Sequence, residues 1–487
     1  MAGNVVEQFG ETLSAKADQR GIEYEGRWYT WGEIRIFGDK LEQDLLDAGC
    51  STGGRIGIVI RNRPTHAASV VGMLGHGRSI AFIYPFLPPS ALAQQVRELG
   101  AEAIIADVDD WPAIRDAVDA ARCAGIELSD MDGGPSLVAG THASGEPGAA
   151  RAGAIEVLSS GTTGAPKRIV MPIELLQRAI DSAPGGEAGQ VPEVQINIWP
   201  LGGVGGVCLL SAAAAHGTPL VIFDRFSLDD FMAAVDRHQP TMLGLNTTVI
   251  SMIMDADIPP ERLASVQSIS GGSSHLSAEL QDKFEERYGI PILWGLGATE
   301  FCGTIARWTP AMRERFKDTK RGSVGQAMPG VSLRAVDPDD GTVLPPGSEG
   351  LLEVNCPSVR EGWVRTTDLC FLDEDGFLFH KGRHDGAIVR GGFKILPEEI
   401  VNVLRMHPAV ADAAVVAVPD ARLGEVPVAA VEAKPGANPT PDELKSHVRD
   451  QLAPVYVPTQ LKIVDALPRT PSLKASLVDV RAMFAPD

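Results

Sequence analysis

The chain has 487 residues, of which 44% are hydrophobic and 22% are charged, and its formal net charge is −20. A chain of this length exceeds one ordinary hydrophobic core, so we expect at least two domains. The negative charge excludes binding of nucleic acid or of an anionic membrane through the overall field, so a polyanionic ligand would need local donors.

The six cysteines are scattered without a CxxC motif, which indicates buried thiols in a reducing compartment. The N-terminal residues lack a basic segment followed by an apolar one, as a secretory signal requires. The longest apolar candidate, residues 204–215, is too short to span a membrane. We therefore expect a cytoplasmic protein without a membrane span.

Strand and helix patterns alternate in the first part of the chain. We predict strands at 55–60, 80–84 and 102–106, with helices at 64–74 and 89–99. This alternation is typical of parallel sheets that are covered by helices.

The middle of the chain repeats this pattern after a break. Residues 133–152 are rich in Gly, Ala, Ser and Pro and predict a surface loop or linker, followed by a strand at 154–158. A second region of strands and helices runs from 194 to about 294, with strands at 220–223 and 290–294.

The character of the chain changes near Gly322. Gly- and Pro-rich turns there separate short strands such as 350–355 and 377–380, which predicts a β-rich subdomain over 322–384.

The last segment has the pattern of a small α+β domain. It contains a predicted helix at 398–404, strands at 413–418 and 426–433, and a helix at 440–452. The last helix begins with a capping box, in which Thr440 is the N-cap and Glu443 follows three residues later. We place the domain boundary at Asp385, between an N-terminal domain over 1–384 and a C-terminal domain over 386–487.

The strongest local signal is the sequence SSGTTGAPK, which directly follows the predicted strand at 154–158. Glycines let backbone amides approach an anion closely, hydroxyl groups add donors, and a lysine adds a full positive charge. The segment is not a Walker A loop, because Pro166 and Arg168 flank the lysine. A solvated surface turn is the alternative interpretation of this composition. The candidate residues of this phosphate loop are Ser159, Ser160, Gly161, Thr162, Thr163, Gly164 and Lys167.

Several further motifs follow the phosphate loop. They are GGVGG at 202–206, SGGSS at 270–274, GLGATE at 295–300, GWVRTTD at 362–368, GRHD at 382–385, RGGFK at 390–394 and PRTPSLK at 468–474. Taken singly, each has an ordinary explanation, such as a tight turn, a helix N-terminus, a surface ion pair or a solvent-exposed lysine. Their order, from about Gly26 to Lys474, resembles the acyl-adenylating superfamily of acyl-CoA synthetases, peptide-synthetase adenylation domains and beetle luciferases.

The resemblance implies roles for residues in the nucleotide site. Thr299 corresponds to a contact of the AMP phosphate and Glu300 to a ligand of Mg²⁺, a hard cation that prefers carboxylate oxygens and water. Leu296 stands where the family usually has an aromatic ring that stacks on adenine. The implied nucleotide-binding residues in these two motifs are Gly271, Gly272, Ser273, Gly295, Leu296, Gly297, Ala298 and Thr299.

Further roles are implied for the later motifs. Asp368 corresponds to the carboxylate that accepts hydrogen bonds from both ribose hydroxyls, and Arg383 to a contact of ribose or phosphate. Asp385 corresponds to the hinge of a mobile C-terminal lid. Lys474 completes the adenylation site, although Leu473 replaces the usual glycine before it. The implied catalytic residues are Lys474, Thr299, Glu300 and Lys167.

The thiol channel and the acyl pocket have two interpretations each. Gly391 and Gly392 correspond to the pair that passes close to the pantetheine of CoA, and a tight turn before a helix also explains them. Gly202 and Gly203 replace an aromatic residue and a histidine, which either widens the pocket or reflects backbone packing. The implied acyl-pocket residues are Pro200, Gly202, Gly203 and Gly297.

We reject a zinc site at His380 and His384, because Gly382 lies between them and both fall in a predicted turn. Glu300 remains the only metal ligand that we expect.

The resemblance implies an α/β fold with layered sheets, a β-rich subdomain and a small mobile α+β lid. The implied reaction is ATP-dependent activation of a carboxylic acid as acyl-AMP with release of pyrophosphate, then transfer to a thiol. ATP, Mg²⁺ and CoA are the expected cofactors and co-substrates. Transfer to the phosphopantetheine of a carrier protein, activation of nitrite for diazotisation of an aryl amine, and a non-catalytic nucleotide sensor stay open, as does a homodimer.

Overall fold

The computed structural model describes residues 5–85, 87–140, 153–158, 168–183, 193–272, 276–390, 393–420, 422–470 and 473–485. The described residues form two compact units, and each is considered by itself. Unit 1 comprises those within Met1–Ser160, Pro166–Gly244 and Ala298–Gly303, and unit 2 those within Leu245–Gly297 and Thr304–Asp487. No helix among the described residues combines the length and the hydrophobicity needed to cross a bilayer.

The elements of the first half of the chain follow in order. They are α1 (Val5–Ala15), β1 (Arg20–Tyr24), β2 (Arg27–Thr30), α2 (Trp31–Asp47), β3 (Arg55–Val59), α3 (Pro64–Gly75), β4 (Ser79–Ile83), α4 (Pro89–Leu99), β5 (Ala103–Asp107), α5 (Trp111–Ala121), β6 (Ala124–Leu128), β7 (Pro135–Ala139), β8 (Ala154–Leu158), β9 (Arg168–Pro172), η1 (Ile173–Leu175), α6 (Leu176–Ser182), β10 (Gln195–Ile196), α7 (Val204–His216), β11 (Leu220–Val221), α8 (Leu228–His238) and β12 (Met242–Leu245).

The elements of the second half continue from there. They are α9 (Thr247–Asp255), η2 (Pro260–Leu263), β13 (Ser268–Gly271), α10 (Ala278–Tyr288), β14 (Ile292–Ala298), η3 (Thr299–Phe301), β15 (Gly303–Arg307), α11 (Pro310–Phe316), β16 (Gln326–Ala327), β17 (Ser332–Val336), β18 (Gly350–Asn355), β19 (Trp363–Leu372), β20 (Leu378–Arg383), η4 (His384–Gly386), β21 (Ile388–Arg390), β22 (Phe393–Ile395), α12 (Pro397–Met406), β23 (Val410–Asp420), β24 (Gly424–Ala433), α13 (Pro441–Gln451), η5 (Pro454–Tyr456), β25 (Gln460–Val464) and α14 (Leu477–Ala482).

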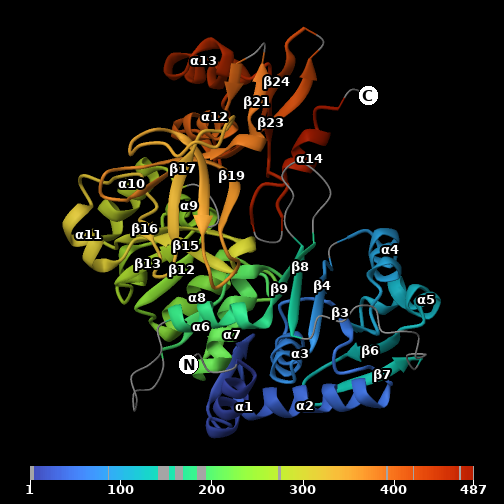
Figure 1. Cartoon of the computed structure of the whole chain (residues 1–487). Coiled ribbons are helices and arrows are strands. Elements are labelled where there is room, and N and C mark those ends of the chain that lie inside the picture. The colour runs from blue at the N-terminus through green and yellow to red at the C-terminus, as the bar shows by residue number, and fades with distance from the viewer. Residues whose placement is uncertain are drawn as a thin grey trace. The chain divides into compact units, whose positions relative to one another are not determined.

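The main sheet of unit 1 has the order β7-β6-β5-β3-β4-β8-β9. Its five central strands are parallel, and β7 and β9 are antiparallel strands at its edges. Figure 1 shows α2 and α3 on one side of the strands and α4 and α5 on the other. Strands covered on both faces form near-continuous apolar runs rather than alternating patterns. In β4 all residues are buried, and all but Ser79 are apolar. The predicted α/β layering is confirmed here.

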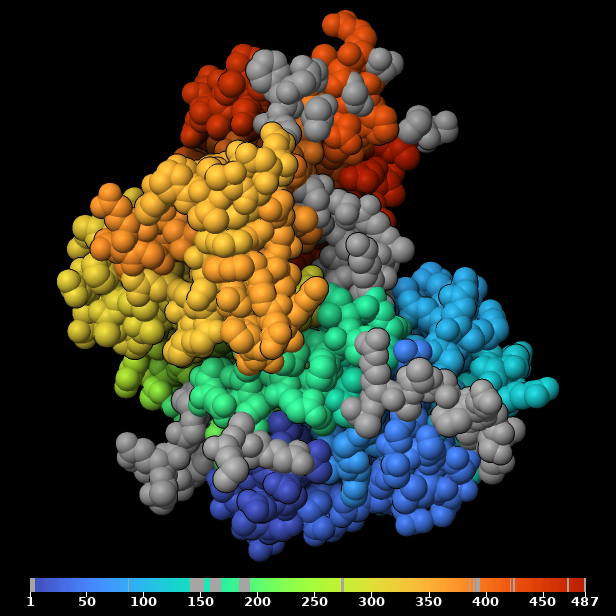
Figure 2. Space-filling view, in the orientation of Figure 1, coloured from blue at the N-terminus to red at the C-terminus, as the bar shows by residue number. Residues whose placement is uncertain are grey.

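Unit 2 contains a four-stranded antiparallel sheet in the order β17-β18-β19-β20. This is the predicted β-rich subdomain. One face of the sheet lies at the surface of the unit (yellow and orange in Figure 2), where Trp363 is 39% exposed and the Arg334 guanidinium lies 4.0 Å from its ring centroid.

The C-terminal part of unit 2 has the predicted α+β pattern. Its sheet has the order β22-β21-β24-β23, and β25 pairs in parallel with β24. One apolar cluster joins this sheet to α12 and α13 through residues such as Leu404 and Leu444, and a second joins it to α14 through Val480. Thr440 and Glu443 form the predicted capping box of α13.

Two predictions of local structure were wrong. The stretch 133–152 was expected to be a loop, but β7 forms within it, because the edge of β6 offers unpaired backbone groups to Pro135–Ala139. The strand predicted at 377–380 was expected to end in a turn that holds His380 and His384, but β20 continues through His380 to Arg383 in register with β19. The domain boundary at Asp385 stays a prediction.

Helices α2 and α3 of unit 1 approach each other through two glycines. A Cβ atom on Gly72 would lie 2.4 Å from the Cα of Gly38, and one on Gly38 would lie 2.6 Å from the Cα of Gly72. These distances are far below van der Waals contact, so the helices would have to separate to admit a methyl group.

We expect Gly72→Ala to lower the free energy of unfolding by about 2 kcal/mol, because the added methyl group overpacks the helix contact. Gly75→Ala, at the end of the same helix, is the matched control, since a Cβ atom there meets no atom of the described part of the chain within 4 Å. Urea denaturation of both variants tests this expectation. Equal effects of the two substitutions would contradict it.

Candidate active site

The phosphate loop connects two paired strands of unit 1. Its residues Ser159, Ser160, Gly161, Thr162, Thr163, Gly164 and Lys167 lie outside the described part of the structure. Strands β8 and β9 are antiparallel, with Leu158 opposite Arg168, so the two ends of the loop lie side by side. The base of the predicted loop is therefore fixed by the sheet.

A charged cluster holds this base. Arg168, the first residue after the loop, donates a hydrogen bond from Nη1 to the carbonyl oxygen of Phe82 over 3.0 Å. Its Nε lies 3.7 Å from Oε2 of Glu156, which is 5% exposed and also pairs with Arg55 over 2.8 Å. These residues could not be predicted from the sequence, because nothing in the local pattern indicates that Glu156 faces two arginines.

Thr299 and Glu300 begin the short 3₁₀ helix η3 of unit 1. Strand β9 lies beside η3, so the exit of the phosphate loop and the Thr-Glu pair are brought together. The Glu300 side chain is exposed, and no hydrogen bond or ion pair engages it among the described residues.

The surroundings of the Glu300 carboxylate fit a Mg²⁺ site better than a metal centre whose ligands all come from the protein. No group of three or more His, Cys, Asp or Glu side chains in the described ranges could hold a metal ion. Mg²⁺ is typically bound through one or two carboxylates, with water and substrate phosphates as the other ligands. A single free carboxylate beside the base of a phosphate loop fits that requirement.

The predicted acyl-pocket segment of unit 1 is held by an asparagine. Oδ1 of Asn62 accepts a hydrogen bond from the Leu201 amide over 2.8 Å. A Cβ atom on Gly202 would lie 2.4 Å from Cγ2 of Ile60, so close packing accounts for that glycine. Gly203 is the N-cap of α7, and among the described residues a Cβ atom there would meet only Pro200, at 3.4 Å or more. The space that a larger side chain would fill therefore lies at Gly203.

Two cysteines link this segment to the Thr-Glu motif. Cys208 on α7 and Cys302, which directly follows η3, have their Sγ atoms 3.8 Å apart. Their hydrogen bond, together with burial, raises the pKa of Cys208, and the same bond lowers the pKa of Cys302. The start of α7 and η3 thus belong to one neighbourhood of unit 1.

The glycine motifs of unit 2 lie on adjacent parallel strands. Gly271 of β13 is in register with Trp294 of β14. A Cβ atom on Gly272 would lie 2.8 Å from the carbonyl oxygen of Gly295, so the two motifs meet at the strand ends. Gly295, Leu296, Gly297 and Ala298 form the end of β14, and Ser273 lies outside the described residues.

Asp368 and Arg383 of unit 2 are partners in the register of β19 and β20. His380 Nε2 donates a hydrogen bond to Oδ1 of Asp368 over 3.2 Å. Burial acts to raise the pKa of Asp368, but the hydrogen bonds of His380 and Thr366 and the charges of His380 and Arg383 outweigh it and lower the pKa. The carboxylate is therefore kept ionised, as an acceptor for a diol must be. His380 was missed as a member of this site because its strand was predicted to end there.

Two further titratable groups border Arg383. Burial raises the pKa of Glu398, and its Oε2 has no hydrogen-bond partner in the described part of the chain. Burial and the positive charge of Arg383 both lower the pKa of Lys474. Unit 2 thus gathers an ionised carboxylate, two basic side chains and a buried carboxyl group whose pKa is raised.

The remaining predicted residues are not tested by this geometry. Asp385 lies in η4 between Arg383 and β21, and Gly391 and Gly392 lie outside the described residues. Their roles as hinge and thiol channel stay predictions.

Known proteins resemble the chain in sequence along its length. 4-Coumarate–CoA ligase 3 of Oryza sativa subsp. japonica is 27% identical over 493 residues, covering 94% of this chain and 88% of that protein. 4-Coumarate–CoA ligase-like 3 of Arabidopsis thaliana is 34% identical over 288 residues. This second match covers 55% of the chain and about half, 51%, of the relative.

Solved structures share the fold. o-Succinylbenzoate CoA synthetase from Bacillus subtilis, in complex with its acyl-adenylate intermediate, has a TM-score of 0.79 at 22% identity, with 97% of each chain covered. ATP-bound MatB from Rhodopseudomonas palustris has a TM-score of 0.82 at 22% identity, covering 98% of this chain and 99% of that one. The predicted fold class is confirmed by these matches.

The family assignment rests on two family models that match successive parts of the chain. The model of AMP-binding enzymes matches residues 9–364, and the model of their C-terminal domain matches residues 399–474. The first match alone covers most of the chain. The chain therefore belongs to the family of AMP-binding enzymes.

Proposed function

We propose that the chain is an AMP-forming acid–thiol ligase, which activates a carboxylic acid with ATP and transfers the acyl group to CoA. The observation that carries the proposal is the Asp368 carboxylate, held ionised on β19 opposite Arg383 in a chain of the AMP-binding family. An ionised carboxylate is a natural acceptor for both hydroxyls of a ribose. The family match and the relatives named as CoA ligases support the same reaction.

In the first half-reaction, an oxygen of the acid attacks the α-phosphorus of ATP, and the bond to pyrophosphate breaks. Negative charge builds up at the phosphorus, so fixed cations lower the barrier. We assign this role to Lys474 and Lys167, and a phosphate contact to Thr299. Mg²⁺ held by Glu300 would neutralise phosphate charge when bound.

In the second half-reaction, the thiol gives up its proton to solvent and its sulfur attacks the acyl carbon. A thioester bond forms, and AMP leaves with the electrons of its bond. A carboxylate is a poor electrophile, and AMP makes it a good one. We assign the approach of the thiol to the Gly391–Gly392 backbone and the change between half-reactions to a rotation at Asp385. A cytoplasmic location and a homodimer stay predictions.

For the acid, we propose an aromatic carboxylate. Two relatives with substantial identity are named 4-coumarate–CoA ligase or 4-coumarate–CoA ligase-like, and the open position at Gly203 leaves room beside the predicted acyl-pocket segment. A nucleotide sensor is disfavoured, because binding alone would not require an ammonium at Lys474 in addition to Asp368 and Arg383.

ATP–pyrophosphate exchange over a panel of acids tests the proposal. We expect exchange with 4-coumarate above o-succinylbenzoate, anthranilate, a medium-chain fatty acid and nitrite, and acyl-CoA by mass spectrometry when CoA is added. Exchange without acyl-CoA would point to a carrier protein or an amine as acceptor. Exchange with nitrite alone would point to diazotisation. Absence of ATP–pyrophosphate exchange with every acid would contradict catalysis.

Lys474→Ala separates the two half-reactions. We expect it to slow exchange by about 100-fold or more, because a preorganised cation at the transition state is lost. Formation of the thioester from supplied acyl-AMP should stay within about two-fold, since the proposed rotation at Asp385 takes the ammonium away from the phosphate before that step. Lys462→Ala on β25 of the same domain is the matched control. Equal loss of both half-reactions would count against separate roles of the C-terminal domain.

His380→Leu tests how Asp368 is kept ionised. Loss of His380 removes a hydrogen bond and a charge that lower the pKa of Asp368, so the pKa of Asp368 rises. A carboxyl group with a lowered pKa stays ionised as the pH falls, whereas one with a raised pKa is protonated sooner and no longer accepts from both hydroxyls. We therefore expect AMP affinity of the variant to fall several-fold between pH 7.5 and pH 5, and that of the wild type to fall less. Calorimetry measures both, with His447→Leu in α13 as control, and parallel pH profiles would refute the assignment.

A further inference from the structure

The C-terminal segment that carries Lys474 folds into a closed turn. The Leu473 amide donates to the carbonyl oxygen of Thr470 over 2.8 Å, and the Thr470 amide donates to the carbonyl oxygen of Lys474 over 2.7 Å. Leu473 adopts a φ of 64°, in the left-handed region that disfavours side chains with a Cβ atom. This turn fixes the backbone on both sides of the Lys474 side chain.

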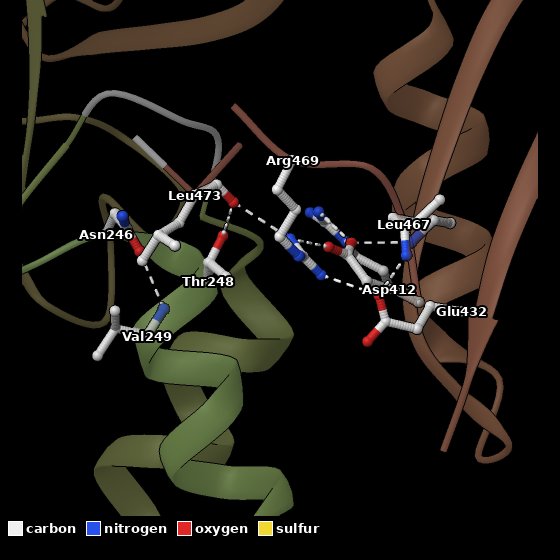
Figure 3. Close-up of polar contacts among 10 residues, drawn as sticks. Asn246, Thr248, Val249, Asp412, Glu432, Leu467, Arg469 and Leu473 are labelled. Carbon is white, nitrogen blue, oxygen red and sulfur yellow. Dashed lines mark hydrogen bonds and ion pairs between the residues drawn. The ribbon is translucent and has the colours of Figure 1, made fainter. Parts of the chain in front are cut away.

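Arg469 holds the turn against the sheet of the same domain. Its guanidinium lies 2.9 Å from Oδ2 of Asp412 and 3.1 Å from Oε2 of Glu432, and its Nη1 donates to the carbonyl oxygen of Leu473 over 3.2 Å. Asp412 is 8% exposed and also pairs with Arg405 over 2.6 Å. Figure 3 shows Arg469 between the two carboxylates and the Leu473 carbonyl.

The same carbonyl is engaged from a second side. The hydroxyl of Thr248, at the start of α9, donates to it over 3.2 Å, as Figure 3 shows. Asn246 caps this helix by accepting a hydrogen bond from the Val249 amide over 2.9 Å. Thr248 therefore lies on a helix whose first turn is fixed by its cap. Both α9 and the turn that carries Lys474 belong to unit 2.

A second contact lies two helical turns further along the same face of α9. Asp255 pairs with Lys434, which directly follows β24, over 2.9 Å. Residues seven apart lie on one face of a helix. Thr248 and Asp255 therefore lie on one stripe of the α9 surface. Ser251 and Met252 lie between them and line a cavity of about 50 Å³, whose other side is formed by residues of the C-terminal segment, Arg469 among them.

We infer that the stripe Thr248–Asp255 of α9 is a docking surface that positions the lysine turn for acid adenylation. The inference rests on the proposed function. Thr248 fixes the Leu473 carbonyl directly before Lys474, and the Asp255–Lys434 pair fixes the rotation of the domain about that point. Both contacts join α9 to the predicted C-terminal domain, so they favour the arrangement of that domain in which adenylation takes place. Both must break if the C-terminal domain rotates for the thioester step.

A charge swap tests the positioning role. We expect Asp255→Lys and Lys434→Asp each to slow ATP–pyrophosphate exchange about three- to ten-fold, because like charges then face each other. The double variant should recover most of the rate, and thioester formation from supplied acyl-AMP should not fall in any of the three. Thr248→Val, which keeps the shape and removes the hydroxyl, should slow exchange about five-fold. Unchanged exchange in the single variants, failure of the swap to restore it, or equal loss in both half-reactions would overturn the inference.

A measurement that needs no turnover separates this inference from the proposed function. A carbodiimide joins a carboxylate to an ammonium in direct contact as an amide, with loss of water to the reagent. We expect peptides containing residues 255 and 434 to be cross-linked in the full chain, and the product to disappear in Lys434→Ala. If the cross-link is absent, the inferred docking of α9 is wrong even when wild-type exchange is normal. If the cross-link forms and no acid supports exchange, the Asp255–Lys434 contact is confirmed and the proposed reaction is wrong.

Discussion

The backbone directly before Lys474 is held from two sides at one carbonyl oxygen. The oxygen of Leu473 accepts hydrogen bonds from Arg469 and from Thr248, and a carbonyl oxygen has two lone pairs for such a pair of donors. A lysine side chain has several rotatable bonds, and ordering it costs about 2 kcal/mol in rotamer entropy. When the backbone on either side is fixed, only those side-chain torsions remain to be ordered when the substrate arrives.

The second constraint is electrostatic. The chain carries a net charge of −20, yet the proposed ligands are polyanions. Local cations in unit 2 can offset this net charge. Arg383 and Lys474 lie close enough together that the charge of Arg383 lowers the pKa of Lys474. Two cations that repel each other are stabilised by an anion between them. Burial raises the pKa of Glu398, so the negative charge that would repel a phosphate is less favourable on this carboxyl group than on an exposed one.

Much of the fold could be predicted from local patterns. The bounds of α4 and β18 and the capping box of α13 were found as expected, because their signals lie within a few consecutive residues. Strand β7 was missed because its pairing with β6 is decided by an edge elsewhere in the chain.

The candidate site divides along the same line. Thr299, Glu300 and Asp368 could be proposed from motifs that are contiguous in sequence, and their roles stay predictions. His380 was missed because its contact with Asp368 depends on the register of two strands. Register is set by pairing across the sheet, and a local periodicity does not contain it.

Leu473 shows how a departure from a family pattern can be consistent with the same chemistry. A left-handed residue with a Cβ atom costs roughly 1 kcal/mol relative to glycine in the folded chain. Glycine, however, gives the unbound turn more conformations to lose, an entropic difference of about the same size. The two terms nearly cancel, so the choice between Leu and Gly is left to the contacts that the turn makes. Here Arg469 and Thr248 hold the carbonyl of that residue from two sides. A stiff turn with two fixed donors needs less freedom than a flexible one that finds its place only when substrate binds.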